Sequence, residues 1–292
     1  MNKRMILYIQ GAILLIESAI MVLPIATALI YREPAGVWFF YTALAAAICG
    51  FAAMKLSRPR TKTIYAKEGL ITVALGWIEL SLVGALPFTL SGEIPFYLDA
   101  VFEMISGFTT TGSSILPNVE ALSRCMLLWR SFSHWLGGMG ILVFMLAIVK
   151  MEGGQGIHLL RAESPGPTVG KMVPRMVDSS KILYTIYFAL TLVQVVFYLA
   201  GGMPLFDSLC NAFATAGTGG FSIKADSFAS YSPYLQTVTT VFMALFGVNF
   251  SIYFFLLQKK FDLAFKNTEL RWYVGIILFS IAMITANILP MY

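Results

Sequence analysis

Two short polar segments carry residue types that can bind a bare cation, and each lies between hydrophobic runs. The first is Thr109–Ser113, with the sequence TTTGS, and the second is Thr215–Ser222, with the sequence TAGTGGFS. Backbone carbonyls and threonine hydroxyls in such a segment can replace the hydration shell of an ion. Non-helical backbone is tolerated at membrane depth only where it is buried in protein or lines a water-filled path. Because the pattern occurs twice, it predicts an ion pore.

Both segments also allow a less specific interpretation. The first could be an ordinary extracellular connector, but a connector would not need the amphipathic run before it, Phe96–Phe108, which is too short to cross a bilayer. Three β-branched threonines disfavour a helix and Gly112 permits unusual backbone angles, so we expect an extended segment whose carbonyls point at an axis. The glycines of the second segment also suit close backbone packing. The matching order of short helix and loop favours the pore for both.

The composition places these segments in a membrane protein. Of the 292 residues, 58% are hydrophobic and 12% are charged, and a typical soluble domain has about twice that charged fraction. The apolar residues fall in runs of about 20, the length that crosses the hydrocarbon core of a bilayer. We therefore expect an all-α integral membrane protein.

The basic residues indicate an orientation. Of the 20 Lys and Arg residues, 16 fall in four clusters, within 3–4, 55–67, 150–181 and 259–271. The clusters alternate with loops poor in basic residues, as the positive-inside rule requires, so we expect a cytoplasmic amino terminus. No basic patch is interleaved with aromatic residues, so the net charge of +5 does not indicate a nucleic-acid partner.

The apolar runs predict a leading helical hairpin, two copies of one unit and a further membrane helix. Each unit has an outward helix, a short helix, a threonine–glycine loop and a return helix. The helices are expected at 5–30 and 36–54, then at 69–90, 95–108 and 126–149, then at 182–199, 204–214 and 234–257, and finally at 272–289. The chain divides into the hairpin with its basic loop (1–68), the first unit (69–153), a cytoplasmic connector (154–181), the second unit (182–261) and the start of an incomplete third unit (262–292).

Five acids lie within or beside apolar runs: Glu17, Glu79, Asp99, Glu103 and Asp207. Acids inside a membrane are costly and usually face a cavity or a partner. Asp99 and Asp207 fall early in the two short helices, where negative charge favours the helix dipole. We interpret all five as structural hydrogen-bonding groups behind the loops, and direct cation ligation by Glu103 is the alternative.

A third motif is Ser133–Gly140, with the sequence SHWLGGMG. Its glycines, Gly137, Gly138 and Gly140, permit close helix crossing in a membrane. Bending of a pore-lining helix is the alternative, and we favour packing. The chain has one other histidine besides His134, so it has no two-histidine metal motif, and no serine or cysteine nucleophile is visibly paired with either histidine. The pattern therefore disfavours an intramembrane enzyme.

Three motifs together resemble the Trk/Ktr/HKT superfamily, and most closely its bacterial TrkH-type potassium uptake proteins. They are Gly107–Gly112, Ser133–Gly140 and Thr218–Ser222. The resemblance covers the whole chain and implies helix–pore-helix–filter–helix repeats, four in the family, arranged around one potassium pathway. It also implies a multi-pass protein of the bacterial cytoplasmic (inner) membrane that conducts potassium passively and is not an enzyme.

The resemblance implies the site residues as well. Six residues would form two quarters of a K⁺ selectivity filter: Thr110, Thr111, Gly112, Thr218, Gly219 and Gly220. Four of them would contribute ligands to the metal ion: Thr110, Thr111, Thr218 and Gly219. Related plant proteins with serine at the first filter glycine favour sodium, so Gly112 implies potassium. The transported potassium ion is the only ligand implied, without an organic cofactor.

The family pattern further implies a homodimer in the lipid bilayer, gated by a cytosolic nucleotide-binding subunit of the TrkA type. This sequence has two of the family's four filter loops, and it lacks the gating loop of the third repeat and the arginine of the fourth. We therefore expect it to correspond to the amino-terminal part of such a protein. The alternative function is a non-conducting membrane subunit, or a half-pore that needs another chain.

Overall fold

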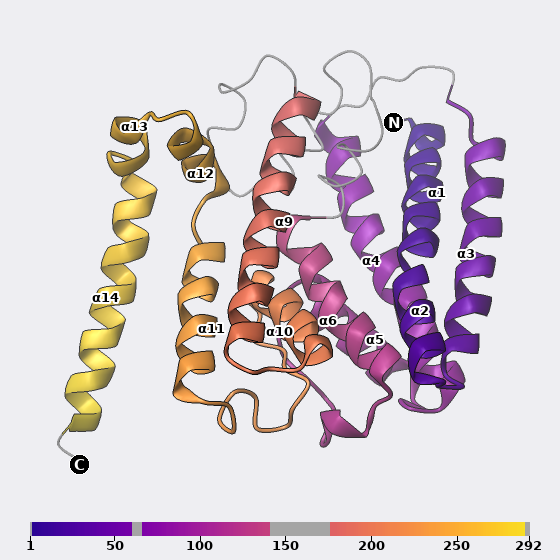
Figure 1. Ribbon diagram of the computed structural model, residues 1–292. Helices are drawn as coiled ribbons and strands as arrows, with labels where there is room; N and C mark the ends of the chain where they lie inside the picture. The colour runs from indigo at the N-terminus through magenta and orange to yellow at the C-terminus, as the bar shows by residue number, and fades with distance from the viewer. Residues whose placement is uncertain (1, 60–65, 141–175, 290–292) are drawn as a thin grey trace.

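A computed structural model describes residues 2–59, 66–140 and 176–289. Within these ranges the chain is helical and contains no β-strand, so the prediction of an all-α protein is confirmed. Figure 1 shows the arrangement of the helices. Their bounds are α1 Lys3–Ile20, α2 Val22–Tyr31, α3 Gly36–Leu56, α4 Ala66–Ser91, α5 Tyr97–Phe108, α6 Arg124–Met139, α9 Met176–Ala200, α10 Leu205–Ala216, α11 Pro233–Phe246, α12 Phe250–Leu257, α13 Phe261–Phe265 and α14 Thr268–Ile288, with a short 3₁₀ helix at Val119–Ala121.

The leading hairpin consists of α1, α2 and α3. Only Met21 separates α1 from α2, and the two together form one membrane-length span. α1 packs on α3 where two glycines meet. A Cβ placed on Gly11 would lie 2.7 Å from the carbonyl oxygen of Gly50, and the reverse distance is also 2.7 Å. Small residues of this kind let helix backbones approach closely in a membrane.

The two units that follow have matching helices. α4, α5 and α6 form the first unit, and α9, α10 and α11 belong to the second. α5 and α10 have 12 residues each and begin 108 positions apart, at Tyr97 and Leu205. Twelve residues rise about 18 Å, well short of the roughly 30 Å hydrocarbon core. The prediction of two short helices is therefore confirmed.

Several predicted boundaries move by a few residues. α4 continues through Pro87, near which the outward helix was expected to end. α5 begins after Pro95, and α9 begins at Met176, inside the predicted connector. Residues 141–149 of the predicted first return helix, and most of the connector 154–181, lie outside the described residues.

The return helix of the second unit is broken, which corrects the prediction of one continuous helix at 234–257. α11 ends at Phe246, α12 begins at Phe250, and the two are bent by 87°. The reason lies at Asn249, whose side chain accepts a hydrogen bond from the backbone amide of Ser251 and starts a new helix there. A side-chain cap of this kind competes with continuation of the preceding helix.

Two tyrosine hydroxyls stabilise the broken end. Tyr253 of α12 donates to the carbonyl of Leu245 at 2.6 Å, and Tyr273 of α14 donates to the carbonyl of Ala244 at 2.9 Å. Both carbonyls lie in the last turn of α11, where helical amide partners run out. The break is therefore stabilised by one side chain from the helix directly after it and by one from the more distant α14.

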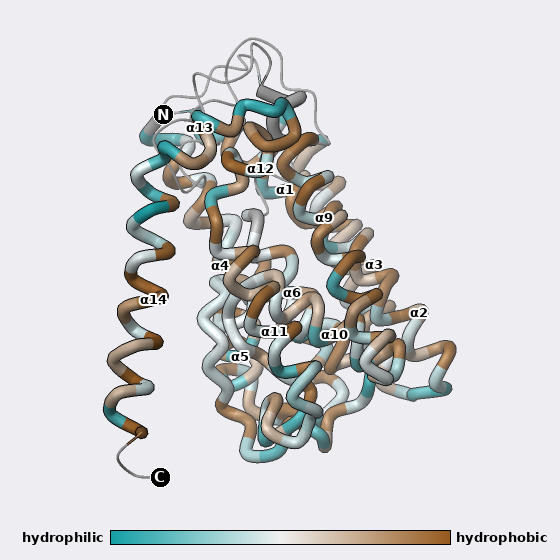
Figure 2. The backbone as a smooth tube through the Cα atoms, turned by 60° about the vertical axis from the view of Figure 1, so that its left-hand side comes forward, coloured by the Kyte–Doolittle hydropathy of each residue, from teal (hydrophilic) through white to brown (hydrophobic). Residues whose placement is uncertain are grey.

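Most of α14 lies apart from the other long helices in both views of the molecule (Figures 1 and 2), and Tyr273 joins it to the end of α11. None of its residues is buried, and hydrophobic residues run along it in Figure 2. In the described part of the chain, five helical spans are long and apolar enough to cross a membrane, or six if α11 and α12 count as one. The predicted order of a hairpin, two repeated units and a further membrane helix is therefore confirmed.

Candidate functional site

The two threonine–glycine loops share an unusual backbone. Thr110 and Thr218 have φ angles of 55° and 56°, and the glycines two positions later, Gly112 and Gly220, have φ angles of 76° and 90°. A positive φ is a genuine outlier for a β-branched residue. Strained backbone persists only where its surroundings enforce it, and it clusters at functional sites. The equal spacing indicates one backbone arrangement used twice.

Each loop begins with the same turn at the end of its short helix. The amide of Thr110 donates to the carbonyl of Gly107 at 3.0 Å, and the amide of Thr218 donates to the carbonyl of Thr215 at 2.9 Å. The prediction of an extended segment is therefore wrong for Thr109 and Thr110, which lie in a turn. The reason is that the last carbonyls of each short helix still accept hydrogen bonds from the first amides of the loop.

The two loops are in backbone contact. A Cβ placed on Gly112 would collide with the carbonyl oxygen of Gly219, and one placed on Gly219 would lie 2.6 Å from the carbonyl oxygen of Thr110. Glycine at both positions is what allows the loops to meet. Three of the six candidate filter residues are thus brought together, namely Thr110, Gly112 and Gly219. The other three are exposed in this part of the protein: Thr111, Thr218 and Gly220.

The return helix α6 packs against the ends of both short helices. A Cβ on Gly137 would collide with the carbonyl oxygen of Phe108, the last residue of α5. One on Gly138 would lie 3.1 Å from the carbonyl oxygen of Ala216, the last residue of α10. The packing interpretation is confirmed for these two glycines. Gly140 directly follows α6 and has a φ of 74°.

A buried ion pair joins α5 to α6 behind the loops. Arg130 Nε lies 2.9 Å from Glu103 Oε2, and the two side chains are 2% and 0% exposed. Glu103 Oε1 accepts hydrogen bonds from the hydroxyl of Ser114 at 2.6 Å and from the amide of Ile115 at 2.5 Å. Both carboxylate oxygens of Glu103 therefore have partners, which confirms its interpretation as a structural hydrogen-bonding group.

Arg130 also contacts the second loop. Its Nη1 donates to the carbonyl of Ser222 at 2.9 Å, and its guanidinium lies 3.5 Å from the centroid of the Phe221 ring. The His134 ring stacks on the same phenylalanine with a centroid distance of 4.0 Å. One buried side chain thus links the first short helix, α6 and the end of the second loop.

Arg130 is the residue that the sequence motifs do not single out. A signal for it exists, because a charged side chain between Trp129 and Phe132 in a membrane helix is expected to be paired or functional. Its partner cannot be found in the same way. Glu103 lies 27 positions earlier, and the pairing follows only from the packing of α5 on α6.

The other predicted acids differ from Glu103. Asp99 and Asp207 lie in the first turns of α5 and α10, as expected. Glu17 is fully buried, and neither of its carboxyl oxygens has a hydrogen-bond partner within the described ranges. Glu79 has one buried carboxyl oxygen, Oε2, without a partner in the same ranges. Glu17 Oε1 lies near Gly84 of α4, which offers no side-chain donor, and the structural role expected of Glu17 stays a prediction.

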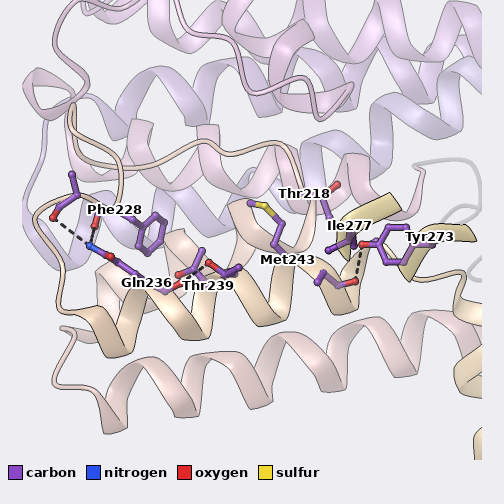
Figure 3. A pocket seen from close by; sticks show the side chains of 11 residues that line it. Thr218, Phe228, Gln236, Thr239, Met243, Tyr273 and Ile277 are labelled. Atoms are coloured by element: carbon purple, nitrogen blue, oxygen red, sulfur yellow. Dashed lines mark hydrogen bonds between the residues drawn. The ribbon is translucent and has the colours of Figure 1, made fainter. Parts of the chain in front are cut away.

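A cavity of about 730 Å³ extends along α11 from the second loop. Thr218 lines it from the loop, Gln236 and Thr239 line it from α11, and Tyr273 and Ile277 line it from α14 (Figure 3). The hydroxyl and amide groups make part of its surface polar. The second loop is therefore reached from a partly polar cavity that lies between α11 and α14.

Fold and site together define a helical membrane protein in which two short helices end in contacting, oxygen-rich loops of matching backbone geometry. A family model described as a cation transport protein, TrkH, matches residues 38–279, most of the chain. The chain belongs to the TrkH family of cation transport proteins.

Individual relatives agree with the family match. The chain is 36% identical over 280 residues to the Trk system potassium uptake protein TrkH of Salmonella typhimurium and 35% identical to that of Escherichia coli, covering 94% of this chain and 58% of each relative. The crystal structure of the potassium transporter TrkH from Vibrio parahaemolyticus matches with a TM-score of 0.85 and 30% identity, over 99% of this chain and 60% of that one. The chain thus spans about three fifths of the length of these relatives.

Proposed function

We propose that this chain forms half of a channel-like pathway for potassium ions, with Thr110–Gly112 and Thr218–Gly220 as two quarters of the selectivity filter. The observation that carries the proposal is the matched placement of a left-handed threonine and a positive-φ glycine in two loops that touch. Carbonyl and threonine oxygens in such loops replace the water around the ion. Flow is passive, and each charge gains about 2.3 kcal/mol per 100 mV of favourable potential.

The electrostatics of the site favour a cation. α5 and α10 both end at the loops, and the carboxyl end of a helix carries a partial negative charge. The buried positive charge of Arg130 would oppose a cation, but Glu103 lies against it and neutralises the pair. Ions at the loops therefore meet helix ends and carbonyl oxygens without a net opposing charge from this pair.

Filter segments other than the two loops of this chain would supply the remaining half of the ion pathway. The relatives named as potassium uptake proteins are longer than this chain, which covers 58% of them. Further filter segments would lie beside the exposed residues Thr218 and Gly220, next to the cavity between α11 and α14. We further propose that Gly112 favours potassium over sodium. The assembled transporter would be a homodimer gated by a TrkA-like cytosolic subunit.

The described basic clusters support an inner-membrane orientation with a cytoplasmic amino terminus. Lys3 begins α1, Lys55 lies in the last turn of α3, and Lys260 precedes α13. The amino terminus and α13 lie at the same end of the molecule in Figures 1 and 2. Clustering of lysine and arginine at one end is what the positive-inside rule requires of the cytoplasmic side.

Rubidium uptake tests the proposal. Potassium-transport-deficient bacteria would express this chain alone, or together with the part of the Vibrio parahaemolyticus protein that it does not match. We expect uptake above an empty-vector control in the second strain. Uptake by the chain alone would mean that its two loops suffice through self-assembly. Absence of uptake in both strains, with the chain verified in the membrane, favours the alternative of a non-conducting subunit.

Two glycine-to-alanine variants, one in the first loop and one on α14, test the filter assignment. Gly112→Ala should abolish uptake, because the added Cβ collides with the Gly219 carbonyl and the φ of 76° is strained for alanine. Gly275→Ala on α14 is the matched control, since nothing lies within 4 Å of its added Cβ. If Gly112→Ala kept both the uptake and the potassium preference at normal abundance, the filter assignment would be wrong.

A further inference from the structure

A buried cluster of hydroxyl groups lies behind the second short helix. Its centre is Tyr198 of α9, whose side chain is completely buried. The Tyr198 hydroxyl lies 2.8 Å from Thr239 Oγ1 on α11 and 3.2 Å from Thr215 Oγ1 on α10. Gln194 Nε2 donates to the same hydroxyl at 2.8 Å. One oxygen atom thus joins three helices at a single point.

The proton inventory gives Tyr198 a specific role in this cluster. The hydroxyl protons of Thr215 and Thr239 can go to the carbonyls of Asn211 and Leu235 in their own helices, at 2.7 and 2.9 Å, or to the Tyr198 oxygen. Tyr198 has one hydroxyl proton, and its oxygen can accept one hydrogen bond in addition to that from the Gln194 amide. Tyr198 therefore donates to one threonine and accepts from the other, so both interhelical contacts need its hydroxyl.

A single backbone hydrogen bond connects this hydroxyl cluster to the second loop. Thr215 lies in the last turn of α10, and its carbonyl accepts the hydrogen bond of the Thr218 amide at 2.9 Å. Thr218 is the residue with the left-handed backbone, and it lines the same cavity as Thr239 (Figure 3). A shift of the last turn of α10 would therefore displace the carbonyls of the loop directly.

Within the described ranges, the first unit does not repeat this cluster behind its loop. The residues 108 positions before Tyr198 and Thr215 are Leu90, which is 46% exposed, and Gly107. Conversely, the residues 108 positions after Glu103 and Arg130 are Asn211 and Val238, which form no ion pair. The two loops share a backbone geometry, but a charged pair supports the first and a neutral hydroxyl cluster supports the second.

We propose that Tyr198 is a positioning residue for the second loop, and that its hydroxyl sets the ion discrimination of that quarter of the filter. This proposal rests on the function proposed above. The Tyr198 hydroxyl fixes the last turn of α10 against α9 and α11, which places the carbonyls of Thr218 and Gly219. Discrimination between cations of similar charge depends on the placement and field strength of such carbonyls, so loss of the hydroxyl relaxes the discrimination.

Amide hydrogen exchange tests the positioning without requiring conduction. In the purified chain, Tyr198→Phe should speed exchange of the 215–222 segment about five- to tenfold, the equivalent of roughly one net hydrogen bond. The segment 107–112 should keep its rate. Tyr234→Phe is the matched control, because its exposed hydroxyl donates to the Phe197 carbonyl at 3.2 Å and makes no hydrogen bond with the second loop in the described part of the chain. Unchanged exchange at 215–222 would overturn the proposal.

Ion selectivity tests the consequence. In cells that show rubidium uptake, Tyr198→Phe should lower the ratio of rubidium to sodium uptake about five- to tenfold at unchanged abundance. If Gly112→Ala also leaves uptake and this ratio unchanged, the filter assignment fails. If Gly112→Ala abolishes uptake and Tyr198→Phe leaves the ratio unchanged, only the role of Tyr198 fails.

A second variant covers the case in which Tyr198→Phe does not reach the membrane. Thr239→Val removes the hydroxyl on α11 that bonds Tyr198, with little change of shape. Thr240→Val is its control, since the Thr240 hydroxyl also lines the cavity but bonds only the Gln236 carbonyl of its own helix. Faster exchange at 215–222 in Thr239→Val alone supports the proposal, and equal exchange in the two variants overturns it.

Discussion

Replacing Glu103 with glutamine leaves a buried charge without its partner. Glu103 Oε2 accepts from Arg130, while Oε1 accepts from Ser114 and Ile115. A glutamine can place its single oxygen on only one side, so its NH₂ group faces a donor on the other. If the oxygen stays with Ser114 and Ile115, the Arg130 guanidinium loses its only acid partner in the described part of the chain. Breaking a buried ion pair in this way costs about 3–5 kcal/mol.

Thermal unfolding of the detergent-purified chain measures this loss. A destabilisation of about 3–5 kcal/mol corresponds to a fall in Tm on the order of 10 °C for a chain of this size. Glu120→Gln is the matched control, because Glu120 is exposed and accepts a single hydrogen bond, from the Ala225 amide at 3.2 Å. The control should unfold within a degree or two of the unmodified chain, since exposed polar contacts contribute about 1 kcal/mol or less.

A double variant separates the charge from the shape. Arg130→Met removes the charge itself, so Glu103→Gln combined with Arg130→Met should recover much of the stability that Glu103→Gln loses. The reasoning is refuted if Glu103→Gln unfolds at the same temperature as Glu120→Gln. It is also refuted if the double variant is as unstable as the sum of the two single variants, because the pair would then contribute no coupling.

Two further predictions concern helix ends. Glu33, in the loop after α2, accepts hydrogen bonds from the amides of Arg124 and Cys125 at 2.8 and 2.9 Å. Glu33→Gln should destabilise the start of α6 by about 1 kcal/mol, measured as a lower Tm; an unchanged Tm would contradict the cap. Tyr273→Phe removes the hydrogen bond to the Ala244 carbonyl, which should cost about 1 kcal/mol. Hydrogen exchange at 244–249 should then be faster, and equal rates would show that the break does not need α14.

The membrane helices could be predicted from the sequence because their signal is local. A run of about 20 apolar residues has few alternatives to a membrane helix, and five of the predicted spans agree with membrane-length helices of the described chain apart from shifts of a few residues. The broken return helix could not be predicted from the same signal. Residues 247–249 are flanked on both sides by apolar runs, so hydropathy averaged over a membrane span gives no break at the single polar residue Asn249. The local signals are weak, and the Tyr273 hydroxyl that stabilises the break comes from a distant helix.

The candidate site shows the same division between local and long-range information. The motifs single out both loops, and Thr110 and Thr218 both have left-handed backbone angles. The role of these residues in a filter stays a prediction. The side chains that hold the loops could not be assigned. Arg130 and Tyr198 are each a single residue within a helix, and their importance follows from partners that only helix packing brings within hydrogen-bond distance.

The two loops share a backbone geometry but are held in place by different side chains, and this difference has a physical basis. An ion meets only the oxygens that line its path, so an ion-binding function constrains the backbone of both loops in the same way. The supporting side chains are constrained only to keep that backbone in place, and an ion pair or a hydroxyl cluster can each do so. Arg130 is the exception, because its contact with the Ser222 carbonyl extends the support of the first loop to the second. Loss of the ion pair should therefore affect both loops, whereas loss of the Tyr198 hydroxyl should affect the second alone.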